Sequence, residues 1–490
     1  MLKLFLHTTK SNAINSLVYG KIILNGEPIF RIQTTNSLEL YQTSPLEFSL
    51  NTTWGRKVFE IKKVADGILL QPDIYGSLPI YAYNHRESLY IANSFGDLLT
   101  LIPSNEYPKL NKQNIIQFLM KEPPNNGETI LDNVQVYGGD SQLIWDGVKQ
   151  KRIFYEHQHQ NMSSSMNIDD IFQKNLEWAK KYKENEIGVT LSGGVDSAVV
   201  WAGLCRMGIK PIALSIIYPH SMGVRQHNKL RQLINIADSK LVTIKPKNYS
   251  FDYNKIDPYK SLYAKLNKRL ANKAKRLGIK IVLTGLGGDQ LASNAGYDGR
   301  GFSFKKVLPK FITQLAVNDY QSLPKYPKAN QKRLIPKTAL NAAGITGELG
   351  FEHKLWSENP LCYPDFWRWT SSLPREWGHN KNGLRGYLKE FGATEISEST
   401  LNEDYRDIYI DGIKHLCISE SLTNLVSHSI LEKWLLIDTK YLLEFLKQEF
   451  NGYSPDMQYI ISVYELEKFL QWYYNIKLKG VDNFYDFTRI

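Results

Sequence analysis

The stretch TLSGGVDSAVV, Thr190–Val200, holds residue types that could bind an anion. Gly193 and Gly194 leave room for the backbone to approach an anion closely. Ser192 and Ser197 carry hydroxyl groups that can donate hydrogen bonds to phosphate oxygens. The stretch joins a strand-like run to a helix-like run, and a helix N-terminus directs free N–H groups at an anion. These features predict a phosphate-binding loop, and the absence of a following GK[ST] excludes a Walker loop.

An aspartate within the same loop predicts a cation as well. A phosphate group would repel Asp196 unless a cation lay between them. Mg²⁺ is commonly held by one or two carboxylates together with substrate phosphates, so the loop suits a pyrophosphate–Mg²⁺ group. The alternative is a Gly-rich turn in which an Asp or Ser side chain caps the helix. We favour the ligand-binding interpretation because the stretch lies between a strand and a helix, as such motifs require.

The elements around this loop predict a parallel sheet. After the helix-like run IDDIFQKNLEWAKKY come EIGVTL, DSAVVWAGLCRMG, KPIALSIIY, QHNKLRQLINIAD, KLVTIKP, a Lys-rich helical segment and IKIVLTG. Strands that alternate with helices indicate an α/β fold with a doubly wound parallel sheet. Such sheets bind ligands at the carboxyl edge of their strands, where the loop would lie. From about residue 350 the chain is expected to be mainly helical.

The first 150 residues or so predict a β-rich domain instead. The turn pairs that separate its short apolar runs, as hairpin turns would, are Asn25–Gly26, Asn84–His85 and Asp146–Gly147. The polar segment His157–Asn167 is interpreted as a linker, because His157 and His159 have no further ligands at metal-binding spacing. We therefore expect one domain over 1–160 and another over 168–490.

The composition is that of a soluble globular protein. The chain has 490 residues, 42% of them hydrophobic and 22% charged, enough for two or three domains. Cys205, Cys362 and Cys417 form no CxxC pair, so we expect neither a disulfide framework nor a zinc site, and a cytoplasmic location. No stretch reaches about 18 apolar residues, so no membrane span is expected. The net charge of +11 favours anionic partners. The basic run Lys265–Lys280 is interpreted as a solvated helix face, with an acidic peptide or RNA site as the alternative.

Three motifs resemble those of asparagine synthetases. LSGGVDS resembles the pyrophosphate-binding loop of ATP pyrophosphatases, which cleave ATP between the α and β phosphates and adenylate a substrate. LTGLGGDQL, Leu283–Leu291, resembles their SGEGADEL segment, whose aspartate is the other Mg²⁺ ligand, so the resemblance gives Asp289 that role. SSLPREWGHNKNGLRGYL, Ser371–Leu388, is similar to their LP…K..LR segment, whose lysine reaches the acyl-adenylate. Lys381 fits that lysine, with Arg385 four residues on.

The resemblance implies ATP and Mg²⁺ and defines a candidate site. Asp196 and Asp289 would hold the metal, and Lys381 would act with them in catalysis by stabilising developing negative charge. The residues implied for the ATP and pyrophosphate site are Leu191, Ser192, Gly193, Gly194, Asp196, Ser197, Gly285, Gly287 and Gly288.

The N-terminal half resembles a class II glutamine amidotransferase domain. The segment that carries this likeness is DIYGSLPIYAYNHRESLYIANSFGDLL, Asp73–Leu99, followed by the domain-closing segment ILDNVQVYGGDSQLIWDG. Members of that class use a cysteine at position 2 as the nucleophile. Here position 2 is Leu2 and the first cysteine is Cys205, and a leucine cannot attack an amide. We therefore expect an inactive glutaminase, so the amine must come from elsewhere.

Two related families also lack that cysteine. β-Lactam synthetases and lasso peptide cyclases each adenylate a carboxylate and let an amine of the same molecule attack it, which exploits proximity. TGLGGDQL is closer to the GHGGD or GGGGD form of the cyclases, and Leu286 cannot relay protons as the β-lactam synthetase tyrosine does. We therefore favour a lasso peptide cyclase, a macrolactam synthetase. It would adenylate an Asp or Glu side chain of a precursor peptide and close an isopeptide ring with the peptide's N-terminal amine, releasing AMP and pyrophosphate.

The resemblance also implies partners and leaves alternatives open. The expected partners are a precursor core peptide, a leader-peptide protease and a leader-recognition protein, whereas nucleic acid is not expected. The alternatives are another amide ligase of this family, a tRNA-modifying ATP pyrophosphatase and a non-catalytic scaffold. The base that deprotonates the amine is unassigned, with candidates by type at Glu348, Glu352, His353 and Glu358. The aromatic residues Trp356, Phe366, Trp367, Trp369 and Trp377 are interpreted as core, with a peptide-binding cavity as the alternative.

Overall fold

The computed structural model describes most of the chain between residues 4 and 479. Side chains are described from Ser49 onward, and before it only the course of the backbone. The gaps within that span are 10–13, 20–21, 25–31, 34–37, 45–46, 53–54, 66, 122–126, 140, 156–165, 219, 246–256, 260–263, 295–307, 324–343, 345, 348–349, 351–354, 400–409, 415–420 and 448–455. The predicted linker His157–Asn167, the pair Asn25–Gly26 and Cys417 therefore lie wholly or largely outside the described residues.

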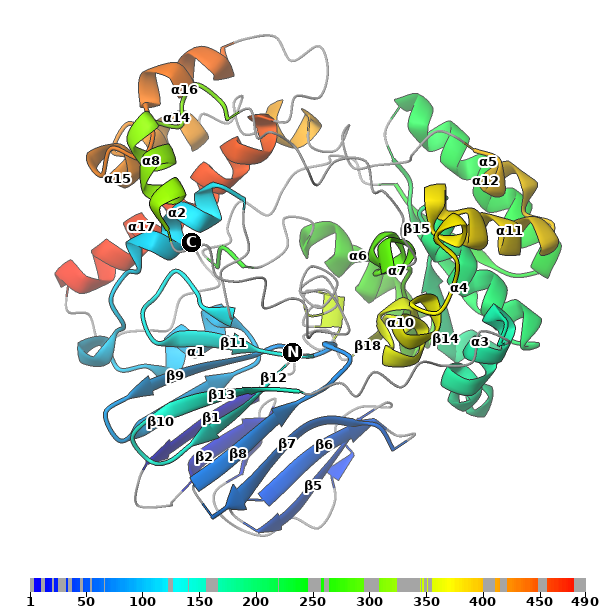
Figure 1. Ribbon diagram of the computed structural model, residues 1–490, viewed down its shortest axis with the longest axis horizontal. Coiled ribbons are helices and arrows are strands. Elements are labelled where there is room, and N and C mark those ends of the chain that lie inside the picture. Colours follow the sequence, from blue (N-terminus) through cyan, green and yellow to red (C-terminus); the bar gives the residue numbers. More distant parts are fainter. Residues whose placement is uncertain are drawn as a thin grey trace.

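The N-terminal part is a sandwich of two antiparallel sheets (Figure 1). The first has the order β11-β9-β10-β1-β2-β3 and consists of β1 (Leu4–Thr9), β2 (Ile14–Tyr19), β3 (Ile22–Leu24), β9 (Ile80–His85), β10 (Ser88–Ala92) and β11 (Val134–Tyr137). The second has the order β13-β12-β8-β7-β6-β5-β4 and consists of β4 (Ile32–Gln33), β5 (Leu38–Ser44), β6 (Glu47–Thr52), β7 (Lys57–Val64), β8 (Gly67–Pro72), β12 (Ser141–Trp145) and β13 (Gln150–Phe154). Phe59 and Leu70 of one sheet share a buried cluster with Ala82 and Ile91 of the other, so the sheets pack face to face.

Two of the predicted hairpin turns fall within the described residues. The turn at Asp146 is confirmed, because its carboxylate accepts hydrogen bonds from the backbone N–H groups of Val148 and Lys149. The turn at Asn84–His85 is wrong by two residues, since β9 runs to His85 and the chain reverses after it. Asn84 is held in the strand because its side chain donates to the Val148 carbonyl and accepts from Trp145 Nε1.

The second half contains the predicted doubly wound sheet. Its five strands are all parallel, in the order β16-β15-β14-β17-β18. They are β14 (Ile187–Thr190), β15 (Ile212–Ile216), β16 (Leu241–Ile244), β17 (Ile281–Leu283) and β18 (Trp356–Glu358). The fold class is therefore confirmed as mixed α/β. The short strand β18 was not predicted, because the sequence after residue 350 indicates mainly helix.

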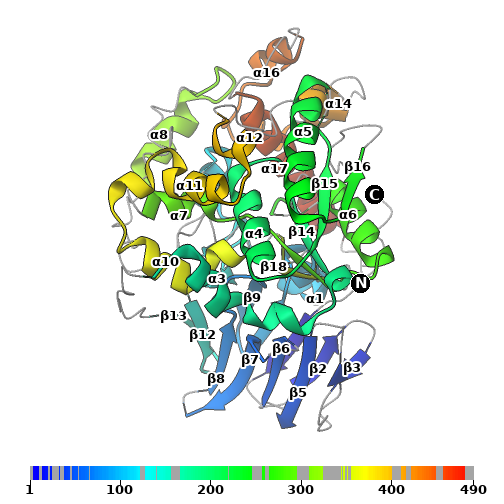
Figure 2. The same ribbon diagram turned by 90° about the vertical axis from the view of Figure 1, so that its right-hand side faces the viewer.

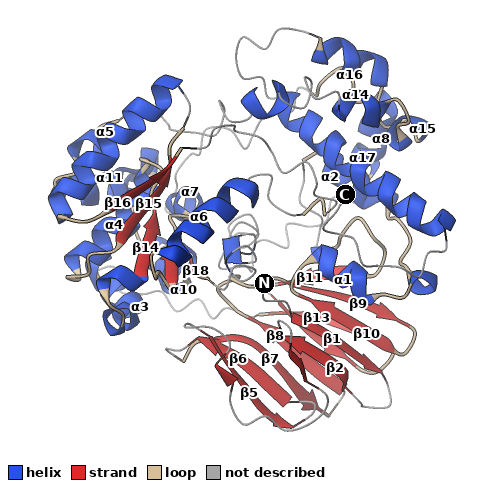
Figure 3. Cartoon of the chain, turned by 180° about the vertical axis from the view of Figure 1, so that it is seen from behind, coloured by secondary structure: helices blue, strands red, loops and turns tan. Residues whose placement is uncertain are grey.

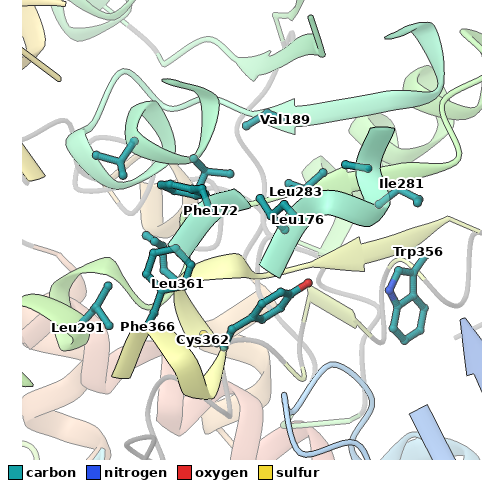
Figure 4. Close-up of a cluster of buried hydrophobic side chains, with 14 of the residues drawn as sticks. Phe172, Leu176, Val189, Ile281, Leu283, Leu291, Trp356, Leu361, Cys362 and Phe366 are labelled. Atoms are coloured by element: carbon teal, nitrogen blue, oxygen red, sulfur yellow. The ribbon is translucent and has the colours of Figure 1, made fainter. Parts of the chain in front are cut away.

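Helices cover both faces of this sheet. The helices that connect or flank its strands are α3 (Ile168–Leu176), α4 (Val195–Arg206), α5 (His220–Ala237), α6 (Ala264–Arg276), α7 (Gly288–Asn294), α10 (Pro364–Thr370), α11 (Asn382–Glu390) and α12 (Thr394–Ser397). Figure 2 shows α4, α5, α11 and α12 together on one side, and α6 packs on β15 with its own buried cluster on the other. The aromatic residues Phe366, Trp367 and Trp369 are core residues of the α4 side, and Figure 4 shows Phe366 beside Phe172.

The remaining helices pack against the N-terminal sandwich. They are α8 (Gln314–Ser322), α14 (Ser421–Val426), α15 (Ile430–Lys433), α16 (Thr439–Leu446) and α17 (Asp456–Lys479), and they meet α1 (Phe95–Leu101) and α2 (Lys112–Leu119) as Figures 1 and 3 show. Phe95 and Ile115 share one buried cluster with Leu422 and Phe469 of this group. The C-terminal helices and the sandwich thus have a common core. Among the described helices, none is both long and apolar enough to cross a membrane.

Candidate functional site

The two glycine-rich loops meet at the carboxyl edge of the parallel sheet. Strands β14 and β17 are neighbours in the sheet although β15 and β16 lie between them in sequence, so the strand order reverses at β14. The loop after β14 and the loop after β17 therefore emerge side by side. A Cβ atom on Gly285 would lie 2.3 Å from Ser197 N, and one on Gly288 would lie 2.2 Å from Asp196 Cγ. Only glycine permits this approach, which explains two of the predicted site glycines.

The first loop is shaped around the N-terminus of α4. Gly193 has φ +84°, in the left-handed region that favours glycine. Gly194 is the N-cap of α4 and provides no side chain to cap the helix. Gly194 N donates to Ser192 Oγ at 3.2 Å, and the hydroxyl groups of Ser192 and Ser197 lie 3.3 Å apart. The loop thus gathers two hydroxyl groups at a helix N-terminus, which suits an anion.

Lys381 joins the two predicted metal-binding carboxylates. Its Nζ lies 2.8 and 2.9 Å from the two carboxylate oxygens of Asp196, which is 185 residues away in sequence, and 2.5 Å from Asp289 Oδ1. Burial raises the pKa of the Asp196 carboxyl despite the opposing charge of Lys381. Burial lowers the pKa of the Lys381 ammonium, but Asp196 and Asp289 more than reverse this and raise it above its ordinary value. The three residues predicted to be catalytic therefore form one cluster.

The cluster has the chemistry of a Mg²⁺ site that is completed by a substrate. The carboxylates of Asp196 and Asp289 converge on one cationic group, the ammonium of Lys381. Within the described part of the chain, no group of three or more His, Cys, Asp and Glu residues could hold a metal ion. Two carboxylates are what Mg²⁺ usually takes from a protein when phosphates and water supply its other ligands. These residues therefore fit Mg²⁺ that arrives with a phosphate group.

Arg385 holds the segment that presents Lys381. Asn380 and Lys381 both have left-handed backbone conformations, with φ of 49° and 61°. Such a conformation costs a non-glycine residue about 1–2 kcal/mol, so neighbouring contacts must stabilise it. Arg385 Nε donates to the Asn380 carbonyl at 2.9 Å, and its Nη1 donates to the carbonyls of Ser397 and Ser399. Arg385, predicted only by its spacing from the lysine, thus fixes the position of Lys381.

A cavity of about 410 Å³ adjoins the two loops. Its polar end includes Ser192, Asp196, Ser197 and Asp289. Much of its other lining is apolar and comes from β15, α6, β17 and the residue before β18, namely Leu214, Ile216, Leu270, Ala271, Ala274, Val282 and Leu355. Five basic residues of the predicted run face solvent on α6, namely Lys268, Arg269, Lys273, Lys275 and Arg276. The helix thus has one face in the cavity wall and one solvated basic face, as predicted.

The other predicted residues have supporting or different positions. Leu191 is buried, lines the cavity and donates its N–H to the Leu214 carbonyl. Gly287 has φ +95° and packs against Cys362, so it gives the second loop its turn. Glu358 is fully buried, and its carboxylate accepts hydrogen bonds rather than facing the cavity, so its position does not suit the proposed base. The other candidates for that base, Glu348, Glu352 and His353, lie outside the described residues.

Two residues that support the site could not be recognised from the sequence. Gln226 of α5 is buried behind Gly193, and its amide group bonds the backbone of Tyr218 and Ile216 and the hydroxyl of Ser215. Arg56 reaches Glu358 from the N-terminal sandwich. Both act through contacts between distant segments, and neither belongs to a spaced motif.

The fold and the candidate site can be compared with those of known proteins. At the point where the strand order reverses, the parallel sheet carries a glycine-rich loop at a helix N-terminus and two carboxylates, Asp196 and Asp289, that both contact Lys381. No protein-family profile and no curated protein sequence matches the chain. Among solved structures, the chain is similar to the U34-tRNA thiolase NcsA from Methanococcus maripaludis with its [4Fe-4S] cluster. The identity is 12%, the match covers 57% of this chain and 78% of the thiolase, and the TM-score is 0.26. A likeness at this TM-score does not indicate a shared function.

Proposed function

We propose that the protein is an AMP-forming, ATP-dependent ligase that joins a carboxylate to an amine. The observation that carries the proposal is the contact of Lys381 with both Asp196 and Asp289 beside the glycine-rich loop. An anion-binding loop, a carboxylate pair and a lysine at one point are the parts that adenylation requires. The adjoining cavity, with one polar end and apolar walls, suits the phosphates and the base of ATP respectively.

The proposed reaction has two steps. In the first, an oxygen of the substrate carboxylate attacks the α-phosphorus of ATP, the bond to the bridging oxygen breaks, and pyrophosphate leaves. In the second, an amine nitrogen attacks the acyl carbon, the bond from that carbon to AMP breaks, and the amine proton passes to solvent. Mg²⁺, when bound, would neutralise charge on the departing pyrophosphate.

The residues of the chain divide this work between them. The hydroxyl groups of Ser192 and Ser197 and the N-terminus of α4 would hold the pyrophosphate portion. Asp196 and Asp289 would hold the metal. The Lys381 ammonium, already at the same point, would stabilise the negative charge that develops on the α-phosphate and on the attacked carbonyl.

We propose further that the amine belongs to the same peptide as the carboxylate, so that the product is a macrolactam of the lasso peptide kind. The resemblance of the TGLGGDQL segment to that of lasso cyclases supports this acceptor. The absence of any cysteine before Cys205 in this chain also supports it, because the N-terminal part then has no thiol to release ammonia from glutamine. The substrate would be a core peptide freed by a leader-peptide protease.

The test is incubation of the purified protein with ATP, Mg²⁺ and synthetic core peptides, followed by mass spectrometry. We expect one AMP and one pyrophosphate for each peptide that loses one water. Asp196→Asn and Lys381→Met should abolish both signals. Hydroxylamine traps an adenylated carboxylate as a hydroxamate, so a hydroxamate without loss of water in any peptide would point to another amide ligase. Formation of ADP, or of AMP only with added tRNA, would overturn the ligase proposal.

A further inference from the structure

Arg56 lies in the loop between β6 and β7 and leaves the N-terminal sandwich to reach the parallel-sheet part. Its backbone N–H donates to Thr52 Oγ1 at 2.9 Å, and Gly55 before it has φ +91°, so the loop is tightly turned. The guanidinium lies over the Tyr75 ring at 4.4 Å from its centre. The side chain is 11% exposed, so it is a buried cation rather than a surface arginine.

The partner of Arg56 is a carboxylate 302 residues away in sequence. Arg56 Nη1 donates to Glu358 Oε2 at 2.8 Å, and Nη2 approaches Asp73 at 3.6 Å. Trp356 Nε1 donates to the other oxygen of Glu358 at 2.6 Å, and the Tyr363 hydroxyl donates to Oε2 at 2.6 Å. The Glu358 carboxylate is thus held from both parts of the molecule, with its side chain completely buried.

Glu358 ends the strand that forms one side of the candidate site. Ser357, the residue before it in β18, lines the cavity. The Glu358 carbonyl accepts the N–H of Thr284 at 2.9 Å, and the Thr284 hydroxyl lies 2.5 Å from Asn359 Oδ1. Thr284 begins the loop that leads to Asp289. A displacement of Glu358 would therefore move both the cavity wall and the loop that carries one of the two carboxylates.

We infer that Arg56 of the N-terminal sandwich is a positioning residue of the nucleotide site, acting through Glu358 on β18 and on the loop before Asp289. The inference rests on the proposed function, since it takes the cavity to be the ATP site. It also gives the sandwich a role that needs no glutaminase chemistry: the sandwich supplies the cation that holds the end of β18 in place.

The charges around Glu358 give this role a distinct signature. The groups that face its carboxylate are Arg56, Asp73, Tyr75 and Tyr363. Burial raises the pKa of Glu358, and the charge of Arg56 opposes that rise. Without Arg56 the pKa of Glu358 rises further. Ionisation of Glu358 then disturbs the site as the pH increases, and nucleotide affinity becomes pH-dependent.

The experiment compares Arg56→Gln with wild-type protein by titrating α,β-methylene-ATP with Mg²⁺ in a calorimeter, well below the unfolding temperature. We expect the affinity of Arg56→Gln to fall by about 10-fold to 100-fold, the effect of a small misplacement of binding groups. The loss should grow as the pH rises, because the raised pKa of Glu358 means that its carboxyl ionises without the compensating charge of Arg56 as protons are removed. Adding Glu358→Gln should remove that pH dependence. Arg56→Lys keeps the charge and serves if Arg56→Gln does not fold.

Arg152→Gln is the matched control. Arg152 also lies over a tyrosine ring, with its guanidinium 4.0 Å from the centre of Tyr137, and donates to Ser141 and the Val136 carbonyl within the sandwich. We expect this variant to lose stability and keep nucleotide affinity. Equal affinity in Arg56→Gln and wild type, or an equal loss in Arg152→Gln, would overturn the inference. Failure of wild-type protein to bind the analogue would instead contradict the proposed function.

Discussion

Replacing Lys381 with Met removes the ammonium group that lies between Asp196 and Asp289. Its Nζ is 2.8 Å from Asp196 Oδ1 and 2.5 Å from Asp289 Oδ1. Removal of one partner from a buried ion pair costs about 3–5 kcal/mol. The lower end of this range applies to Lys381. The Asp289 side chain is 65% exposed, so water screens its charge, and only the Asp196 side chain, at 21% exposed, is largely shielded from solvent. We therefore expect the free energy of unfolding of the nucleotide-free protein to fall by about 3 kcal/mol.

The same substitution should tighten the binding of a divalent cation. Lys381 lies at the point on which the two carboxylates converge, so an incoming cation must displace it. In Lys381→Met a cation meets no competitor and restores the missing positive charge. If the bound cation restores about 1.4 kcal/mol, roughly half of the stabilisation lost with Lys381, the variant should bind the cation about tenfold more tightly than wild type. The protein would thus gain affinity for the metal while it loses AMP formation.

The assay is a titration of Mn²⁺ without nucleotide, followed by electron paramagnetic resonance of the free ion. Lys389→Met is the matched control, since Lys389 lies on α11, the helix that directly follows Lys381, with its side chain 67% exposed. It should bind Mn²⁺ like wild type. If Lys381→Met binds Mn²⁺ no more tightly than Lys389→Met does, then Lys381 does not compete for the cation position and the reasoning is refuted.

Three further predictions follow from particular contacts. Gly288→Ala places a Cβ 2.2 Å from Asp196 Cγ and should reduce AMP formation by about 100-fold, whereas Gly386→Ala, with no neighbour within 4 Å, should leave both the rate and the melting temperature at or above wild type. Burial raises the pKa of Glu467 above its ordinary value of 4.5, so its contribution to stability is complete below that pH and is lost as the pH rises through the raised pKa. The melting temperature of wild type should therefore fall as the pH rises through this pKa, and that of Glu467→Gln should not. If the two melting temperatures change with pH in the same way, the raised pKa of Glu467 is contradicted. Burial raises the pKa of the Cys362 thiol to about 12, so iodoacetamide at pH 8 should label it only after unfolding, as peptide mass spectrometry would show.

The local part of this structure could be predicted from the sequence. The strand–loop–helix around Ser192 depends on glycines, a helix start and apolar runs that are all within a few residues of one another. The motifs around Asp289 and Lys381 could be recognised by resemblance, and the fold brings them to Asp196. Alternation of strands and helices also predicted the doubly wound sheet, because its strands β14, β15, β16 and β17 alternate along the chain with α4, α5 and α6.

What the sequence did not indicate depends on contacts between distant segments. The strand β18 has three residues, too few for a periodic pattern, and is defined by its pairing with β17. Arg56 resembles any loop arginine until Glu358 is placed beside it. The basic run of α6 was recognised by its lysines. The part that Leu270 and Ala274 of the same helix play in the cavity wall is seen only in the folded structure. Such roles arise from tertiary packing, which local spacing does not encode.

The core shared by the C-terminal helices and the sandwich has a consequence for how the protein can be divided. The Tyr473 hydroxyl of α17 donates to the Pro108 carbonyl at 2.7 Å, and α17 packs on α2. A recombinant fragment limited to 168–490 would contain every residue proposed for catalysis. It would also expose the apolar side of α17, including Phe469, to water. Such a fragment should aggregate, so complementation or domain-swap experiments must include the N-terminal sandwich together with residues 168–490.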